Sequence, residues 1–194
     1  MTPDFTFAIK GNRYITHIKR LKDREESIAK FFESANSLMS SDYRIKSGSL
    51  KAVVGKHVIL WQLPPSFKKD IKKLETFLEL LPDNFRHAFE FRHKSWTSDV
   101  FEDLFHSLRI ETSVVLQDWR EWPIYKEPIG NFIYIRFHGR EQLYTSGYSK
   151  EELAQWAEKV QKWVISGLDV YAYFNNDALG YAPENARKLS ELLI

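Results

Sequence analysis

Short apolar runs alternate with longer amphipathic stretches along this chain of 194 residues. The short runs are rich in Val, Ile, Phe and Tyr and are bounded by polar or proline-containing segments, which is the pattern of β-strands. The run "HVILWQLPP", for example, has a buried-strand pattern that two prolines end. The predicted strands are Phe5–Lys10, His57–Pro65, Arg86–His93, Thr112–Asp118, Asn131–Gly139 and Asp169–Asp177.

Helical spacing of apolar residues separates these strands. After the first strand, Ile28, Phe31, Phe32 and Ala35 recur three or four residues apart, which places them on one face of a helix. Ser98 is the expected N-cap of a later helix, because a serine side chain accepts from the unpaired N–H groups of the first turn. The predicted helices lie near 20–39, Lys68–Leu81, Ser98–Leu108, Lys150–Ile165 and Pro183–Leu193.

Alternation of strands and helices with short connections predicts an α/β fold with a parallel sheet. An open doubly wound sheet and a barrel both satisfy this pattern. The barrel is favoured, because most of the predicted strands end in polar residues and no glycine-rich phosphate loop is present. A full TIM barrel needs eight strands and about 250 residues. We therefore expect one domain over residues 1–194, an incomplete TIM-type (β/α) barrel of about six parallel strands.

Alternation along each strand assigns its side chains to faces. Glu90 and Arg92 share a face with Ala88, whereas Phe89 and Phe91 point the other way, toward the helices. The same reasoning for the other strands places a set of polar side chains on the lumen rim, namely Lys10, Gln62, Glu90, Arg92, Arg136, His138 and Asn175.

This rim carries three permanent cations and one carboxylate. Buried charges cost several kcal/mol each unless they are paired, so we expect a small anionic ligand such as a phosphate or carboxylate. Glu90, the one carboxylate of this rim, and His138 are the acid/base candidates. His138 is included because the reference pKa of histidine lies near neutrality. Structural alternatives stay open: Glu90 and Arg92 form an ion pair without catalytic role, His138 caps a turn, and His17 is an ordinary loop residue.

Amino-acid composition and charge limit the class of protein to which this chain can belong. The hydrophobic fraction of 43% is sufficient for a packed core, and the net charge of +2 gives no general basic field. The absence of cysteine excludes disulfides and thiolate metal sites and suits a cytoplasmic protein. Apolar runs are far shorter than the roughly 20 residues that span a membrane, and no signal peptide is recognisable. Histidines and carboxylates lack metal-ligand spacing, so we expect no metal and no cofactor.

Several motifs resemble, in the same order, those of the YecE-like family, a domain of unknown function numbered seventy-two. They are "ITH", "WQLPPSF", "EFRHKSW", "IRFHG", and "YFNND" followed by "APENA". The resemblance covers nearly the whole chain and implies a TIM barrel, but no known reaction. It adds four residues to the substrate-binding candidates Lys10, Gln62, Arg92, Arg136 and Asn175, because they stand at motif positions: His17, His93, Trp96 and Asn176.

The chain departs from this family at its N-terminus. The "GTSGW"-like first strand and the "STFY"-like motif of the second strand are absent, and "FTFAIKGNRYITH" resembles the third strand and the loop after it. We therefore expect a shortened chain that resembles strands three to eight. Sheet edges left unpaired in this way favour self-association.

The leading expectation is an enzyme, or the remnant of one, that acts on a small anionic or sugar-like substrate at the C-terminal face of the barrel. In this reading Lys10, Arg92 and Arg136 hold the anion, and Gln62 and Asn175 orient it. One alternative is a nucleic-acid-binding protein with a basic, aromatic-rich rim, in which Trp96, Trp119 and Trp122 stack on bases. The other is a truncated fragment without catalytic function.

Overall fold

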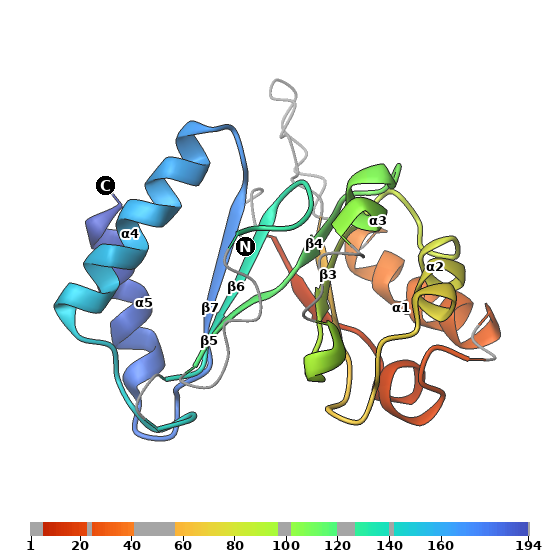
Figure 1. Cartoon of the computed structure of the whole chain (residues 1–194), viewed down its shortest axis with the longest axis horizontal. Helices are drawn as coiled ribbons and strands as arrows, with labels where there is room; N and C mark the ends of the chain where they lie inside the picture. The colour runs from red at the N-terminus through yellow and green to blue at the C-terminus, as the bar shows by residue number, and fades with distance from the viewer. Residues whose placement is uncertain are drawn as a thin grey trace. The chain divides into compact units, whose positions relative to one another are not determined.

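The computed structural model describes residues 6–22, 25–40, 57–96, 102–119, 127–139 and 142–193. The chain divides into two units, Met1–Thr112 and Ser113–Ile194, and each is described by itself (Figure 1). No helix among the described residues is long and apolar enough to cross a membrane.

The first unit contains a sheet with the strand order β1-β2-β3-β4, in which β4 lies at the boundary between the units. The pairs β1–β2 and β2–β3 are parallel. The elements are β1 (Ala8–Lys10), η1 (Tyr14–Ile18), α1 (Glu25–Ser40), β2 (Val58–Gln62), α2 (Ile71–Leu78), β3 (Arg86–Glu90), η2 (Lys94–Trp96), α3 (Glu102–Ser107) and β4 (Thr112–Val114).

Register places the side chains of this sheet on two faces. Gln62 pairs with Glu90 in the β2–β3 ladder, and residues paired in a parallel ladder point to the same side. The neighbouring Trp61 and Phe89 are likewise paired and point to the other side. The face assignment predicted from alternation is therefore confirmed for Glu90 and Phe89, and it separates a polar face from a core face.

The core of the first unit is built around Trp61, which is fully buried. Helices α1 and α2 cover this face of the sheet (Figure 1), and the Trp61 ring contacts Phe31 and Phe32 of α1 and Phe77 of α2. The indole N–H of Trp61 donates to Nδ1 of the buried His87 at 3.2 Å. Because Nδ1 accepts this bond, the neutral His87 ring carries its proton on Nε2, which donates to the carbonyl of Pro82 at 2.8 Å.

The second unit has a parallel sheet with the order β5-β6-β7, and two helices pack on one side of it (Figure 1). Its elements are β5 (Leu116–Asp118), β6 (Ile133–Phe137), α4 (Lys150–Ile165), β7 (Val170–Phe174) and α5 (Tyr181–Leu192). The core side chains come from β6, α4 and α5, and include Ile133, Ile135, Phe137, Leu153, Val160 and Leu189. Helix α4 begins with a capping box, in which Ser149 and Glu152 each bind the other's backbone N–H.

The predicted strand Thr112–Asp118 is wrong as a single element, because it forms β4 and β5 in two different sheets. At the end of β4, Val114 N–H bonds to the carbonyl of Ile129, and Ser113 forms an antiparallel bridge with Gly130. All residues of this segment are buried, so they form one continuous apolar run. Such a run does not show whether the segment forms one strand or two. The change of pairing partner depends on distant residues and has no local signal.

The predicted α/β class with parallel strands is confirmed by the observed pairings. Among the described residues the strands form a sheet of four and a sheet of three, and their pairings do not close into a barrel. Helix α4 has the predicted bounds, whereas α1 begins later than predicted, at Glu25. The predicted N-cap Ser98 lies outside the described residues.

A test of this core is the variant His87→Leu. It leaves the Trp61 indole N–H and the Pro82 carbonyl without a partner, so we expect the free energy of unfolding to fall by about 2–4 kcal/mol. Urea denaturation followed by Trp fluorescence measures this change. Thr76→Ala, on the exposed side of α2, is the control and should change the value by less than about 0.5 kcal/mol. An equal effect of the two variants would contradict the assigned bonds.

Candidate functional site

The site begins where β1 ends and the chain crosses the Trp61 ring. A Cβ atom on Gly11 would lie 2.4 Å from Cε3 of Trp61, which is far inside van der Waals contact. The N–H of Gly11 also donates to the carbonyl of Leu60 at 2.8 Å. Only glycine therefore allows the backbone to lie this close to the core, and this contact fixes the start of the next segment.

Element η1 is a π-helical turn, closed by the bond from Lys19 N–H to the carbonyl of Tyr14 at 2.8 Å. Two non-glycine residues in the left-handed region follow it, Arg20 with φ 49° and Leu21 with φ 61°. Such backbone costs about 1–3 kcal/mol per residue and is enriched at functional sites, as are single π-turns. Here the buried side chains of Ile15 and Leu21 hold the segment in place.

His17 lies on η1, half-buried, and its charged neighbours that influence its pKa are all cations. Burial lowers its pKa below the ordinary value, and Arg13, Lys10 and Arg92 lower the pKa further, in that order. The imidazole is therefore neutral at pH 7 and sits in a positive field. Such a field attracts anions and disfavours a further proton on the ring until an anion is bound.

The hydrogen bonds of Thr16 assign the tautomer of His17. The hydroxyl of Thr16 donates to the carbonyl of Asn12 at 3.2 Å, and it lies 2.9 Å from Nδ1 of His17. Since a hydroxyl has one proton to donate, Nδ1–H of His17 is the donor in the second contact. The lone pair of the neutral ring is then on Nε2, which is the atom available as a base.

Glu90 ends β3 as a fully buried carboxylate with two donors. Its Oε1 accepts from Nε2 of Gln62 at 2.9 Å and from Nε of Arg92 at 2.7 Å. Charge-assisted bonds of this kind satisfy a carboxylate that would otherwise be costly to bury. The side chain of Arg92 is 28% exposed, so Glu90 holds in place a cation that is only partly buried.

Five of the predicted residues are connected at the carboxyl ends of β1, β2 and β3, because Gln62, Glu90 and Arg92 are hydrogen-bonded and the charges of Lys10 and Arg92 lower the pKa of His17. Sequence reasoning missed Arg13, which is the N-cap residue of η1 and lowers the pKa of His17 more than Lys10 does. Strand alternation cannot assign a residue outside the strands to a face. Only its position four residues before His17 of the "ITH" motif could have indicated it.

Two predicted residues on the segment after β3 have structural partners. Nδ1 of His93 accepts from the backbone N–H of Ser95 at 3.1 Å, and the Ser95 hydroxyl lies 2.8 Å from the same atom. Trp96 is fully buried, its ring is stacked on Phe91 at 4.2 Å, and its N–H donates to the carbonyl of Phe67. The expected availability of Trp96 for stacking on a ligand is therefore wrong.

Trp119, another ring expected to stack on bases, is half-buried in the second unit, and Trp122 lies outside the described residues. The polar strand ends of this unit form separate contacts. Nε of Arg136 donates to Oδ1 of Asn175 at 3.0 Å, and Arg136 is half-buried. His138 is buried and its ring meets Tyr144 edge to face at 5.4 Å.

Asn176 belongs to a buried amide network rather than to an exposed rim. Its Nδ2 donates to the carbonyl of Ser146 and to Oδ1 of Asn185, both at 2.9 Å. Oδ1 of Asn185 also accepts from the backbone N–H of Tyr148 at 3.2 Å. Asn185 was not among the predicted site residues, although it lies in the "APENA" motif, and its contacts tie α5 to the start of α4.

The described residues contain no group of three or more histidine or carboxylate side chains arranged to hold a metal ion. The acid/base and substrate-binding roles assigned from the sequence stay predictions.

Taken with the fold, these contacts define an α/β protein whose parallel strands end in polar networks. The chain belongs to the DUF72 family, described as "Protein of unknown function DUF72", whose model matches residues 1–194. The resemblance to this domain of unknown function is thereby confirmed. Over 164 residues the chain is 26% identical to the UPF0759 protein YunF of Bacillus subtilis (strain 168). That match covers 70% of this chain and 57% of YunF.

Solved structures of DUF72 family proteins have the same fold. One from Thermotoga maritima MSB8 is 27% identical with a TM-score of 0.78, and the match covers 100% of this chain and 75% of that one. Another from Enterococcus faecalis V583 is 23% identical with a TM-score of 0.77, covering 99% of this chain and 75% of that one.

The close approach of Gly11 to Trp61 is tested by Gly11→Ala. The added methyl group must displace the Trp61 ring or the backbone, so we expect the free energy of unfolding to fall by about 1–3 kcal/mol. We also expect a changed NMR signal of His17. The control is Gly167→Ala, where φ is 89° but no atom lies within 4 Å; it should cost about 1–2 kcal/mol and leave His17 unchanged. An unchanged His17 signal in Gly11→Ala would contradict the proposal that the position of His17 depends on the contact between Gly11 and Trp61.

The cationic surroundings of His17 are tested by titrating its Cε1–H signal by NMR. We expect a pKa below the ordinary value of 6.5, and Arg13→Ala should raise this pKa because it removes one of the cations that lower it. Lys22→Ala, which removes an exposed cation from the same segment, should leave the pKa unchanged. An unchanged pKa in Arg13→Ala, or an equal rise in Lys22→Ala, would contradict the assignment.

Proposed function

We propose that this chain is an enzyme acting on a small anionic or sugar-like substrate, with its anion-binding centre at the carboxyl ends of β1, β2 and β3. Lys10, Arg13 and Arg92 bind the anionic group, and His17 is the general base. The observation that carries this proposal is an imidazole whose pKa is lowered first by burial and then further by three cations, Arg13, Lys10 and Arg92. These cations disfavour a proton on His17, whereas a bound anion attracts them and favours the protonated ring.

The residues divide into binding and positioning roles. Glu90 is held by Gln62 and Arg92 through one oxygen and has no exposed surface, which supports a role in orienting Arg92. The guanidinium then presents a fixed plane to a phosphate or carboxylate, the geometry in which arginine binds such groups best. Acid/base roles for Glu90 and His138 remain predictions, and the contacts of Glu90 support the positioning role more strongly.

His17 supplies the proton-transfer step. Its Nε2 lone pair takes a proton from a hydroxyl or C–H group of the substrate next to the bound anion. The imidazolium that forms is stabilised by that anion, and it then gives its proton to the product or to water, which restores the neutral base. A base that is neutral at pH 7 and becomes more basic when the anion binds suits general base catalysis.

For the fold we propose the TIM-type barrel, incomplete and with about six parallel strands, that the strand ends favour. Parallel pairing, helices on one face of each sheet and polar groups at the carboxyl ends of β2 and β3 support it. The absence of cysteine supports a cytoplasmic location. The nucleic-acid alternative loses one of its stacking rings, since Trp96 is buried.

Sulfate binding tests the anion site, because sulfate keeps its charge throughout the pH range of interest. We expect saturable binding by calorimetry that weakens with added NaCl, and a loss of about tenfold in affinity in Arg92→Ala or Arg13→Ala, which is about 1.4 kcal/mol. Lys22→Ala is the matched control and should bind like the unchanged protein. Equal weakening by Lys22→Ala would indicate general attraction by surface charge and contradict the site.

The pH dependence follows from the same cluster. A bound anion raises the pKa of His17, so sulfate binding takes up a proton and affinity rises as pH falls toward and below 6.5. His17→Gln should keep the affinity seen near pH 8 and lose this rise. Calorimetry in buffers of different ionisation enthalpy measures the proton uptake. The same pH dependence in His17→Gln would assign the proton to another group and contradict the role of His17.

A further inference from the structure

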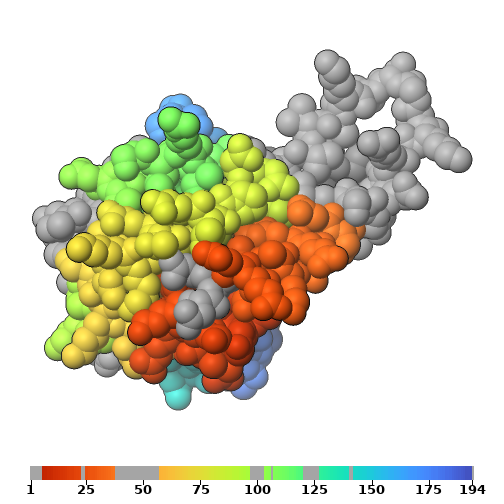
Figure 2. All heavy atoms as spheres, turned by 90° about the vertical axis from the view of Figure 1, so that its right-hand side faces the viewer, coloured from red at the N-terminus to blue at the C-terminus, as the bar shows by residue number. Residues whose placement is uncertain are grey.

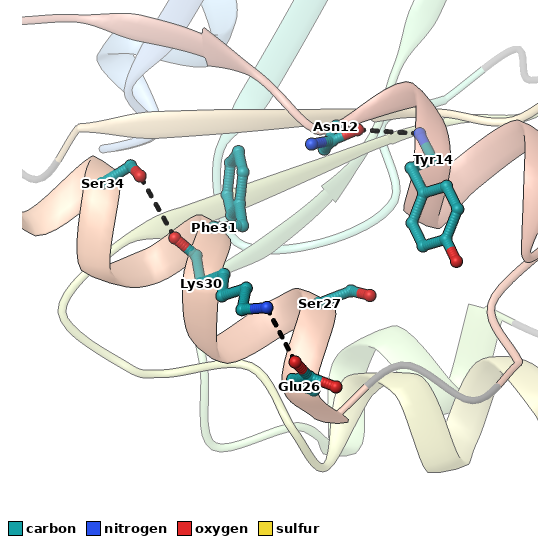
Figure 3. Close-up of a pocket in the computed structure, with 7 residues that line it drawn as sticks. All are labelled: Asn12, Tyr14, Glu26, Ser27, Lys30, Phe31 and Ser34. Atoms are coloured by element: carbon teal, nitrogen blue, oxygen red, sulfur yellow. Dashed lines mark hydrogen bonds and ion pairs between the residues drawn. The ribbon is translucent and has the colours of Figure 1, made fainter.

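A cavity lies between η1 and α1, next to the segment that carries His17. Its volume is about 520 Å³, and its walls are Asn12, Tyr14, Glu26, Ser27, Lys30, Phe31 and Ser34 (Figure 3). Small-molecule pockets in proteins have volumes of roughly 300–1,000 Å³, so this cavity is of the size that holds a ligand. None of Lys10, Arg13, His17 and Arg92 lines it. On the surface, η1 and α1 lie side by side, in red and orange (Figure 2).

The two charged side chains that line this cavity form an ion pair with each other. The ammonium of Lys30 lies 2.7 Å from Oε1 of Glu26, one helical turn away, and these are the two charged residues among those that line the cavity. The lining therefore has no net charge, in contrast to the cations around His17. This balance disfavours a phosphate or carboxylate as the ligand and favours a neutral polar molecule.

Aromatic rings come from both walls. Phe31 projects from α1 and is held by ring contacts with Phe32 and Trp61, each at 5.3 Å, while Tyr14 projects from η1 and is 44% exposed (Figure 3). An aromatic ring offers a flat apolar face with negative charge density. The face of a sugar ring on which several C–H bonds point in one direction has the complementary shape and polarity.

The remaining lining groups combine donors and acceptors. Oδ1 of Asn12 accepts from the backbone N–H of Tyr14 at 2.8 Å, which fixes the orientation of the Asn12 amide. Ser27 extends its hydroxyl from α1 toward the Tyr14 side of the cavity (Figure 3), and Ser34 donates its hydroxyl proton to the carbonyl of Lys30. Sugar hydroxyls both donate and accept, so a wall of amide, hydroxyl, carboxylate and ammonium groups can satisfy them.

We propose that this cavity is a binding site for a neutral pyranose ring, stacked on Phe31 and Tyr14 and hydrogen-bonded by Asn12 and Ser27. This site is separate from the anion-binding centre and does not depend on the function proposed above. The ion pair Glu26–Lys30 contacts the ring hydroxyls from the side of α1.

NMR of the full chain with methyl α-D-glucopyranoside as the probe tests this site. We expect saturable shifts of the amide signals of Asn12, Tyr14 and Ser27, with a dissociation constant of about 1 mM or below. Ser27→Ala should weaken binding about fivefold or more, which is about 1 kcal/mol. Ser37→Ala removes a serine of the same helix outside the cavity and should leave the affinity unchanged. Because 44% of Tyr14 is exposed, Tyr14→Ala should fold normally and abolish the shifts of Asn12 and Ser27.

Salt distinguishes this site from the anion site. Glucoside binding should not change in about 0.5 M NaCl, whereas sulfate binding should fall steeply. The proposal is overturned by shifts that do not saturate, by shifts confined to Lys10 and Arg92, or by equal weakening in Ser27→Ala and Ser37→Ala. Displacement of the glucoside by adenosine at lower concentration would overturn the assigned ligand class, since it would indicate a planar aromatic ligand.

Discussion

The contact between the backbone of Gly11 and the face of Trp61 is the constraint on which the first unit depends. Trp61 connects β2 to both covering helices and, through His87, to β3. The chain leaving β1 must therefore pass directly over the most central side chain of the core. With no side chain at Gly11, the backbone can lie directly against the Trp61 ring, and η1 begins three residues later at Tyr14. The position of His17 therefore depends on that of Trp61.

On the polar face of the same sheet, the buried carboxylate of Glu90 holds the cation of Arg92 in place. Glu90 accepts from Gln62 and from Nε of Arg92, and the Arg92 side chain is 28% exposed. Arg13, the N-cap residue of η1, adds a further charge that lowers the pKa of His17. The positive field at the imidazole therefore comes from two segments of chain, the run from Lys10 to Arg13 and Arg92 after β3.

Sequence reasoning predicted the parts of this structure that depend on local pattern. Parallel strands, covering helices and the opposite directions of Glu90 and Phe89 follow from periods of two and of about 3.6 residues. It failed where distant partners decide the outcome. The run 112–118 changes sheets because Val114 pairs with Ile129, and Trp96 is buried because Phe67 and Phe91 enclose it. The π-turn and Arg13 were missed for a related reason, since a segment between the predicted elements has no period from which faces can be assigned.

Asn12 contributes both to the cavity between η1 and α1 and to the hydrogen bonds that lead to His17. Its side chain lines the cavity and binds the N–H of Tyr14, while its carbonyl accepts from Thr16, whose hydroxyl accepts from Nδ1 of His17. A group that moves Asn12 from within the cavity would alter the bond that assigns the His17 tautomer. The strained residues Arg20 and Leu21 limit how far η1 can adjust in response, because left-handed backbone at non-glycine residues has few alternatives of similar energy. The same short segment therefore both lines the cavity, through Asn12 and Tyr14, and determines the position of the His17 ring.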